Sequence, residues 1–335
     1  MGKLLAFGEV LLRISPPSRQ LLLQSPSLDV WVGGAEANVV TQLALLGHHA
    51  ALATMVPDND LGRRAIAALR GHGVDTTGVR FGGERMGLYF VTTGAGLRAT
   101  EVIYDRAGSA FATGSAESWD WDALLAGVDR LHLSGITPAL GDEPARAALA
   151  AAHAATEREI AVSFDGNWRG KLWERRAVDP RLILAAIVAH ADLLFGDERD
   201  VALLLGRSFA GDDSERRREA AEAAFAAFPK LQTIASTART VEHVDRHRLS
   251  ARIDQRDDHA ETEEVEVAGI VDRIGGGDAF AAGVLHALRD GGTIDDAARA
   301  GLALAVLKHS LPGDAALFRR SDLDAYLTGG LDVRR

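Results

Sequence analysis

The sequence predicts an α/β protein with a mostly parallel central sheet and a small accessory β-sheet. Short apolar runs of strand length alternate with Ala-rich amphipathic stretches through most of the 335 residues. This alternation is typical of βαβ units, in which helices cover both faces of a parallel sheet. Two β-rich segments, at about 10–32 and 86–106, interrupt the alternation and carry no helical pattern. They predict the accessory sheet, which we expect to act as a lid or a dimer contact.

Each predicted strand is a short, mainly apolar run. The predicted strands cover residues 4–7, 51–55, 131–133, 160–164, 193–195, 233–235 and 265–267. Each predicted helix repeats apolar residues at helical spacing. The predicted helices cover residues 36–46, 60–72, 143–157 and 214–228, with closing helices at 294–311 and 321–327. No repeat or low-complexity linker divides the chain, so we expect a single domain over 1–335 with the lid strands inserted into it.

Composition narrows the class of protein. The formal net charge is -10 and no long basic run compensates it, so we expect no nucleic-acid partner. The absence of cysteine excludes disulfides and thiol catalysis. No apolar stretch reaches membrane-spanning length, and the apolar N-terminal run is too short for a signal peptide. We therefore expect a cytoplasmic enzyme with no membrane partner.

A glycine-rich segment, Gly275-Gly276-Gly277-Asp278, stands at the start of an apolar helical run. Glycines let consecutive backbone N–H groups approach an anion, and the helix dipole adds positive potential at the same place. A carboxylate beside such a site suggests a base that takes a proton from a hydroxyl attacking a phosphoryl group. The motif fits equally a glycine-rich turn in which Asp278 is an N-cap residue.

Other catalytic and metal motifs are missing from the sequence. There is no P-loop signature, no protein-kinase H-R-D or D-F-G set and no G-x-S-x-G elbow. His243 and His247 have a spacing that could suit a metal, but their surroundings indicate a hairpin or loop. We expect a solvated loop there.

A second glycine motif, Gly33-Gly34-Ala35-Glu36-Ala37-Asn38, also leads into a helical run. Together with 275–278 it resembles the two signatures of the ribokinase-like (PfkB) carbohydrate kinases. Further blocks are similar to the 2-keto-3-deoxygluconate kinase branch of that family. They lie at residues 87–90, 104–110, 163–173 and 307–314. The resemblance covers nearly the whole chain and implies a ribokinase-like three-layer sandwich with a β-sheet lid.

The resemblance implies roles for individual residues. Asp278 would be the catalytic base, and Gly275, Gly276 and Gly277 would form the anion hole for the transferred phosphoryl group. The residues that would line the sugar-acid pocket are Gly34, Asn38, Tyr89, Tyr104, Arg106 and Arg169. The residues that would contact ATP are Ser236, Thr237, Arg273, Gly275, Gly277 and Lys308. Mg²⁺ would accompany ATP.

The chemistry of arginine supports the roles of the two predicted pocket arginines independently of the family resemblance. Arg binds carboxylates in a two-pronged fashion, and a keto-acid substrate carries a carboxylate that a neutral sugar lacks. The alternative for Arg106 is a surface ion pair with Asp105. For Arg169 an ion pair is a weaker alternative, because it follows a predicted strand end, where ligands bind in such sheets.

The sequence departs from the family pattern at the metal motif. Where relatives often carry N-x-x-E, this chain has Asp197-Glu198-Arg199-Asp200. The resemblance implies that Asp197 and Asp200 hold the metal through water. Arg273 stands where many relatives have a small hydroxyl residue, and it could reach a nucleotide or product phosphate. Residues 241–258 are strongly charged and leave the adenine pocket undefined.

The sequence therefore predicts an ATP-dependent kinase that phosphorylates the terminal hydroxyl of 2-keto-3-deoxygluconate. Alternatives are a PfkB-family kinase for a neutral sugar such as fructose or ribose, and a weakly catalytic sugar-binding protein. We also expect a homo-oligomer formed through the lid sheet.

Overall fold

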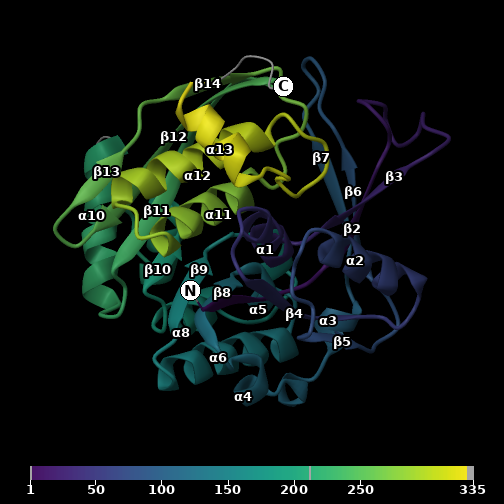
Figure 1. Ribbon diagram of the computed structural model, residues 1–335, viewed down its shortest axis with the longest axis horizontal. Helices are drawn as coiled ribbons and strands as arrows, with labels where there is room; N and C mark the ends of the chain where they lie inside the picture. The colour runs from purple at the N-terminus through teal and green to yellow at the C-terminus, as the bar shows by residue number, and fades with distance from the viewer. Residues whose placement is uncertain (1, 211–212, 330–335) are drawn as a thin grey trace.

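A computed structural model describes residues 2–210 and 213–329 of the chain (Figure 1). Its large sheet has the strand order β13-β12-β11-β10-β9-β8-β1-β4-β5, and β14 pairs with β12. The parallel strands are β1 (Lys3–Phe7), β4 (Ala50–Val56), β5 (Val79–Phe81), β8 (Val128–Ser134), β9 (Ala161–Asp165), β10 (Leu193–Phe195) and β11 (Thr233–His243). The antiparallel strands at one edge are β12 (Arg246–Gln255), β13 (His259–Glu261) and β14 (Val265–Ala268). The predicted mainly parallel sheet is confirmed.

Strand β1 shows why the molecule has three layers. Its side chains alternate, so Leu4 and Ala6 join one hydrophobic core while Leu5 and Phe7 join the other. All four are at most 1% exposed. A strand buried on both faces must have helices on each side, which explains the continuous apolar runs of the predicted strands.

The helices divide between the two faces (Figure 1). One face is covered by α1 (Ala35–Leu45), α2 (Asp60–Gly71), α11 (Gly276–Arg289), α12 (Ile294–Lys308) and α13 (Arg320–Leu327). The longer helices of the other face are α6 (Asp142–Glu157), α8 (Pro180–Val188), α9 (Glu198–Leu205) and α10 (Asp213–Ala227). Short helices complete the structure at Ala110–Thr113 (α3), Ala116–Ser118 (η1), Trp121–Leu124 (α4), Ile136–Ala139 (α5) and Gly170–Trp173 (α7). In the part of the chain that is described, no helix is long and apolar enough to cross a membrane.

A separate four-stranded sheet is formed by the two segments that interrupt the α/β alternation. Its order is β3-β2-β6-β7, with β2 (Leu11–Ser15), β3 (Asp29–Gly33), β6 (Gly87–Thr92) and β7 (Glu101–Asp105). Strands β2 and β6 pair in parallel although they come from different segments of the chain. The predicted accessory sheet is confirmed, and Figure 1 shows it standing to one side of the large sheet.

The antiparallel edge differs from the sequence prediction. Residues 265–267 do form a strand, but β14 pairs antiparallel with β12 instead of continuing the βαβ alternation. The charged residues 241–258 form most of a long β11–β12 hairpin, whose exposed face tolerates charge. His243 is exposed beside the turn, whereas His247 lies on β12 and is only 1% exposed, so the expected solvated loop is wrong for His247. The predicted domain 1–335 includes residues 1, 211–212 and 330–335, which lie outside the described residues.

Candidate active site

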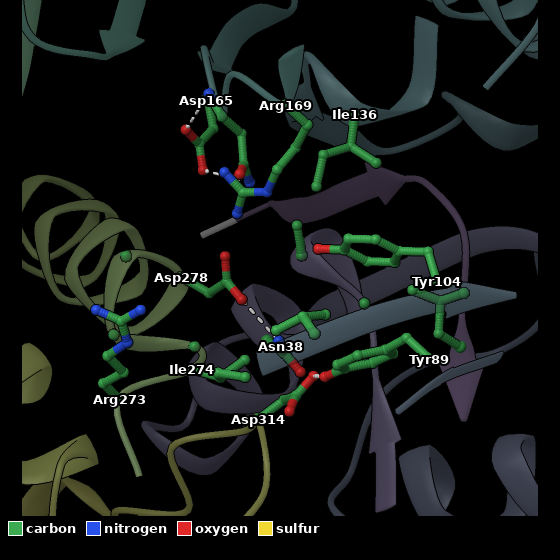
Figure 2. Close-up of a pocket in the computed structure, with 18 of the residues that line it drawn as sticks. Asn38, Tyr89, Tyr104, Ile136, Asp165, Arg169, Arg273, Ile274, Asp278 and Asp314 are labelled. Atoms are coloured by element: carbon green, nitrogen blue, oxygen red, sulfur yellow. Dashed lines mark hydrogen bonds between the residues drawn. The ribbon is translucent and has the colours of Figure 1, made fainter. Parts of the chain in front are cut away.

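A cavity of about 500 Å³ lies where the small sheet faces the carboxyl ends of the central strands (Figure 2). Parallel strands of an open α/β sheet present their following loops at this edge, where ligands bind. The predicted residues that line the cavity are Gly34, Asn38, Tyr89, Tyr104, Arg106, Arg169, Arg273, Gly275, Gly276, Gly277 and Asp278. The fold thus brings the two glycine motifs together, although more than two hundred residues separate them.

The glycine run forms the entry to helix α11. Gly275 is the N-cap with φ 83°, a left-handed conformation, and a Cβ there would lie 1.8 Å from the Asp314 carbonyl oxygen. No side chain caps the helix, so backbone N–H groups of its first turn face the cavity without a side-chain acceptor. A Cβ on Gly277 would meet nothing within 4 Å, so packing does not require glycine there. Open space beside uncapped N–H groups suits an incoming anion.

Asp278 does not have the N-cap role that the sequence left open. It lies inside the first turn of α11, and its Oδ2 accepts a 2.6 Å hydrogen bond from Asn38 Nδ2. Figure 2 shows the other carboxylate oxygen facing the centre of the cavity. Burial raises the pKa of Asp278 to about 7, although the bond from Asn38 opposes the rise. A carboxylate with this pKa can accept a proton near neutral pH.

The small sheet contributes an aromatic wall and a buried ionic network. The rings of Tyr89 and Tyr104 stack with centroids 5.9 Å apart. The Tyr89 hydroxyl donates to Asp314, which also accepts a 3.0 Å bond from Arg13 Nη1. Arg13 Nη1 lies 2.5 Å from an oxygen of Asp272 as well. The network ties β2 and β6 to the segments that carry Asp272 and Asp314, and so it places the aromatic wall beside Gly275.

The two predicted substrate arginines have different surroundings. Arg106 is buried and donates through Nε to Glu9 Oε2 at 2.9 Å, with a second, shorter bond from Nη2. Asp105 pairs instead with Arg85 at 2.8 Å, so the alternative partner considered for Arg106 is wrong. Arg169 is exposed at the cavity, and among the described residues its one hydrogen bond goes to its neighbour's backbone carbonyl. Its guanidinium is therefore the freer of the two.

Two further cavities, of about 250 and 470 Å³, adjoin the first on the other side of the glycine run. Thr237 lines both and Ser236 lines the larger. Arg239 lines all three cavities, while Arg273 lines the first and the smaller neighbour. Desolvation lowers the pKa of Arg239, and the nearby positive charge of Arg273 lowers it further. Two like charges held together attract an anion strongly.

A comparison with known families decides the class of protein to which this fold and cavity belong. Residues 1–318 match the model of the pfkB family carbohydrate kinases. The chain belongs to the PfkB family. It is a sugar kinase with the ribokinase-like fold.

Relatives with known names support the assignment along the whole chain. The 2-dehydro-3-deoxygalactonokinase of Haloferax volcanii is 32% identical over 330 residues, with 98% of each chain covered. The crystal structure of 2-dehydro-3-deoxygluconokinase from Thermotoga maritima has a TM-score of 0.93 and 34% identity, covering 98% of this chain and 100% of that one. A PfkB family carbohydrate kinase from Listeria grayi has a TM-score of 0.91 and 33% identity, covering 97% and 99%.

The predicted metal residues of this PfkB kinase have a structural role in the helix that they begin. Asp197 Oδ1 accepts from the N–H groups of Arg199 and Asp200, and Asp200 Oδ2 accepts from the Asp197 N–H at 3.0 Å. This reciprocal pair is a capping box for α9. Both carboxylates also line the larger neighbouring cavity, together with Asp165. Burial and the charge of Asp197 raise the pKa of Asp200 to about 6.

This carboxylate group fits a divalent cation. Burial, together with the charges of Asp278 and Asp200, raises the pKa of Asp165 well above its ordinary value. A bound cation relieves such repulsion, and oxygen ligands are those that Mg²⁺ prefers. Among the described residues, Asp165, Asp197 and Asp200 do not form a group whose ligand atoms all lie within 4.8 Å of one another. This spacing favours contact with the cation through water.

Lys308 differs from its predicted contact with ATP. Its side chain is fully buried, and Nζ donates to the carbonyl oxygens of Asp272 at 3.2 Å and Leu311 at 3.1 Å. The apolar helix α12 packs this residue inward, where a sequence pattern would place a surface lysine. Lys308 therefore holds the two segments that flank the anion hole, and its ammonium is not free for a nucleotide.

Sequence reasoning did not select several residues that line the site. Asp165 ends strand β9, and its place at a predicted strand end was the available signal. Asp314 lies in the block 307–314 that carries the family resemblance, and Arg239 follows the predicted ATP contacts Ser236 and Thr237, but nothing in the sequence marked either residue individually. Arg13 lies within strand β2 and Glu9 lies between β1 and β2, and the local sequence gave no indication of their partners.

Proposed function

We propose that the protein transfers a phosphoryl group from ATP to the terminal hydroxyl of a 2-keto-3-deoxy sugar acid, with 2-keto-3-deoxygluconate as the substrate. One observation carries the proposal: the same cavity is lined by a carboxylate with a pKa near neutrality and by a guanidinium that has no side-chain hydrogen-bond partner among the described residues. Asp278 supplies the base that accepts the proton of the sugar hydroxyl, and the guanidinium of Arg169 supplies paired N–H donors for the substrate carboxylate. The names of the Haloferax and Thermotoga relatives support this substrate class.

The proposed chemical step uses residues of the glycine run. The sugar hydroxyl oxygen attacks the terminal phosphorus of ATP, and its proton passes to the free oxygen of Asp278. The new O–P bond forms as the bond to the bridging oxygen of ADP breaks. Uncapped N–H groups after Gly275 stabilise the charge on the transferred group, and Arg273 and Arg239 add positive potential.

The proposed nucleotide side comprises Ser236, Thr237 and the two neighbouring cavities. Asp197 and Asp200 would hold Mg²⁺ through water, and the ion would supply positive charge that offsets the charge of the ATP phosphates. Among the predicted nucleotide contacts, Lys308 is withdrawn because its ammonium is buried.

The proposed substrate pocket uses the small sheet as a lid. Tyr89 and Tyr104 present their rings to the cavity. Gly34 also lines it, and glycine is required there because φ is 138° and a Cβ would lie 2.3 Å from the Glu9 carbonyl oxygen. Arg106 contributes through its remaining N–H groups, since Glu9 already takes two bonds from it. Closure over the sugar would exclude water and limit ATP hydrolysis.

The outer face of the small sheet supports the proposed homo-oligomer. Val30, Ile14, Phe90 and Ile103 are consecutive register partners across all four strands. Directly opposed residues share a face of the sheet, and alternation turns Phe90 away from the cavity that Tyr89 lines. Val30 is 37% and Ile103 49% exposed. Light scattering of wild type and Ile103→Glu tests the assembly, and an unchanged mass would contradict it.

A substrate panel with ATP tests the reaction. ADP release is measured with 2-keto-3-deoxygluconate, its galactonate epimer, fructose and ribose, and Asp278→Asn is run in parallel. We expect the keto-deoxy acids to exceed the neutral sugars in kcat/KM and Asp278→Asn to lose about 10²–10⁴-fold in kcat while it still binds substrate. Preference for fructose or ribose would favour the neutral-sugar kinase. Sugar binding by calorimetry without turnover of any substrate would favour the weakly catalytic binding protein.

A further inference from the structure

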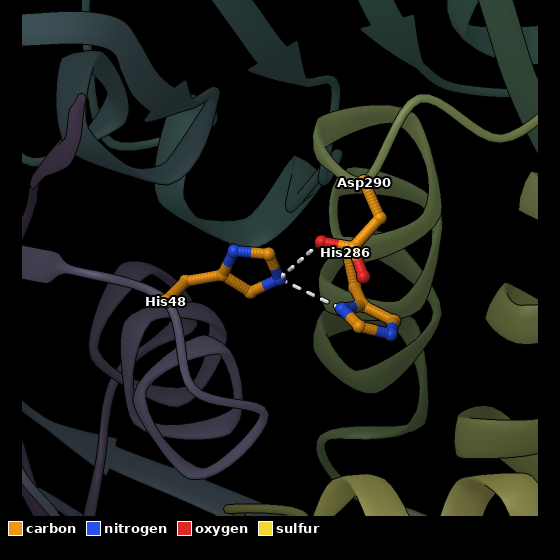
Figure 3. A group of neighbouring side chains, drawn as sticks. All are labelled: His48, His286 and Asp290. Atoms are coloured by element: carbon orange, nitrogen blue, oxygen red, sulfur yellow. Dashed lines mark hydrogen bonds and ion pairs between the residues drawn. The ribbon is translucent and has the colours of Figure 1, made fainter. Parts of the chain in front are cut away.

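Three side chains far from the glycine run converge at the opposite end of helix α11 (Figure 3). His48 follows helix α1, and His286 and Asp290 lie in and just after the last turn of α11. His48 Nε2 is 2.7 Å from His286 Nδ1 and 3.9 Å from Asp290 Oδ1. Within residues 2–210 and 213–329 this is the single group of three or more candidate ligands whose atoms all lie within 4.8 Å of one another.

The two imidazoles are prepared to act as ligands. His48 is 8% and His286 6% exposed, so both rings are held by surrounding protein. Burial lowers the pKa of His48 to about 4 and also lowers the pKa of His286. A neutral ring has one nitrogen lone pair, and the two rings direct nitrogens at each other. The 2.7 Å contact is an N–H···N hydrogen bond, so a metal that binds both nitrogens must shift one ring proton to the other nitrogen of that ring.

Asp290 completes the group from the same helix end. Residues 286 and 290 are four apart, so their side chains share one face. Asp290 Oδ2 forms a 2.7 Å ion pair with Arg320 Nη1, while Oδ1 is the oxygen nearest His48. A hydrogen-bonding partner on the outer oxygen, here Arg320, fixes the orientation of a carboxylate that binds a metal through its other oxygen. The Asp290 side chain is 26% exposed, which leaves an entry path and room for water.

We propose that His48, His286 and Asp290 bind a divalent transition-metal ion of the zinc type. The ligand atoms are His48 Nε2, His286 Nδ1 and Asp290 Oδ1, and water takes the remaining position. Two nitrogens on one tetrahedral ion stand about 3.3 Å apart, so the rings must separate slightly from their present hydrogen bond and the carboxylate must approach. The set of two imidazoles and a carboxylate favours zinc, cobalt or nickel over magnesium or calcium.

The site would join the ends of two helices that build the active site. Helix α1 carries Asn38 near its start and helix α11 carries Asp278, and the two helices pack along each other. A metal between His48 and His286 fixes their distal ends. Binding of metal to the folded chain alone stabilises that chain by mass action. The proposal stands on this geometry and does not depend on the identity of the sugar.

Calorimetry with ZnCl₂ and cobalt absorption spectroscopy on chain without an affinity tag test the proposal. We expect one equivalent of Zn²⁺ to bind, Co²⁺ to give the visible bands of a four-coordinate site, and Zn²⁺ to raise the melting temperature. His286→Ala and Asp290→Asn should each weaken binding by at least about tenfold. His49→Ala is the matched control, because His49 is exposed beside Asp75 and should leave binding unchanged.

The variants keep the test decisive. Circular dichroism first establishes that each variant is folded. If His286→Ala does not fold because its site is buried, Asp290→Asn alone tests the metal site. Absence of stoichiometric binding to wild type, or equal binding by wild type and folded Asp290→Asn and His286→Ala, would overturn the proposal. In that event the trio is a hydrogen-bonded contact between α1 and α11 only.

Discussion

Asn38 Nδ2 donates a 2.6 Å hydrogen bond to Asp278 Oδ2 and so joins the first turns of helices α1 and α11. The bond favours the ionised carboxylate and lowers its pKa, whereas burial disfavours that form and raises it. Burial is the larger effect, and the pKa is about 7. The contact connects the two glycine motifs through the base itself.

Removal of this bond should shift the pH dependence of the reaction. A base acts when deprotonated, so kcat/KM falls as the pH drops through the pKa of Asp278. Asn38→Ala removes an interaction that lowers the pKa, so the acidic limb should move above pH 7. The pH profile of kcat/KM measures this shift. Asn59→Ala, which removes an N-cap of α2, is the control and should leave the limb in place. An unmoved limb in Asn38→Ala would count against Asp278 as the titrating group.

The two pocket arginines should respond differently to truncation. Arg169→Ala should raise the KM for the sugar acid by about ten- to over a hundredfold, the equivalent of ~1.5–3 kcal/mol for a charge-assisted bond, with little loss of stability. Arg106→Ala should also lower the free energy of unfolding by about 3–5 kcal/mol, since Glu9 is left buried without its partner. Steady-state kinetics and urea unfolding separate the two effects. Arg85→Ala, on the exposed pair with Asp105, is the control. If neither substitution changes KM, a neutral substrate is favoured.

The glycine run offers a matched pair of substitutions. Gly275→Ala should destabilise the protein by more than about 1–2 kcal/mol, because φ is 83° and the new Cβ would lie 1.8 Å from a carbonyl oxygen. Gly277→Ala meets no protein atom within 4 Å, so its stability should stay within about 1 kcal/mol of wild type. The added methyl group nevertheless occupies the anion approach and should lower kcat. Thermal melts and kcat on both variants check this, and a fully active Gly277→Ala would place the phosphoryl group elsewhere.

Lys308 should contribute more to the free energy of unfolding than to the affinity for ATP. Lys308→Ala removes the donor from two buried carbonyls, at about 1–3 kcal/mol for each group left unsatisfied. Urea unfolding measures the loss, and the exposed Lys230→Ala serves as its control. Unchanged stability together with a raised KM for ATP would restore the predicted nucleotide contact.

The elements that sequence patterns predict well are those that local chemistry specifies. Strands β1, β4, β8 and β10 are buried on both faces, and continuous apolar runs identify such strands. The antiparallel pairing of β14 was missed because a short run does not encode its partner's direction. Strand β5 has three residues, two of them exposed, and so lacks a hydrophobic signal.

The residues of the site also fall into those that the local sequence indicates and those that it does not. Gly275 and Asp278 were found because a glycine run before a helix has a direct physical meaning. The bond between Arg13 and Asp314 joins residues 301 positions apart, and no local pattern carries such a pairing. Likewise, Lys308 looks like a surface residue in sequence, and its burial depends on how α12 packs.

The pair of Glu9 and Arg106 has a mechanical consequence. The chain passes between the two sheets at residues 8–10, 34, 82–86 and 106–109. Glu9 lies in the first passage, while Arg106 and Ser109, which both donate to its carboxylate, lie in the last. These hydrogen bonds therefore hold the connecting segments 8–10 and 106–109 together. Any movement that closes the small sheet over a substrate must therefore carry these two connecting segments together, and the strands cannot bend independently where they leave them.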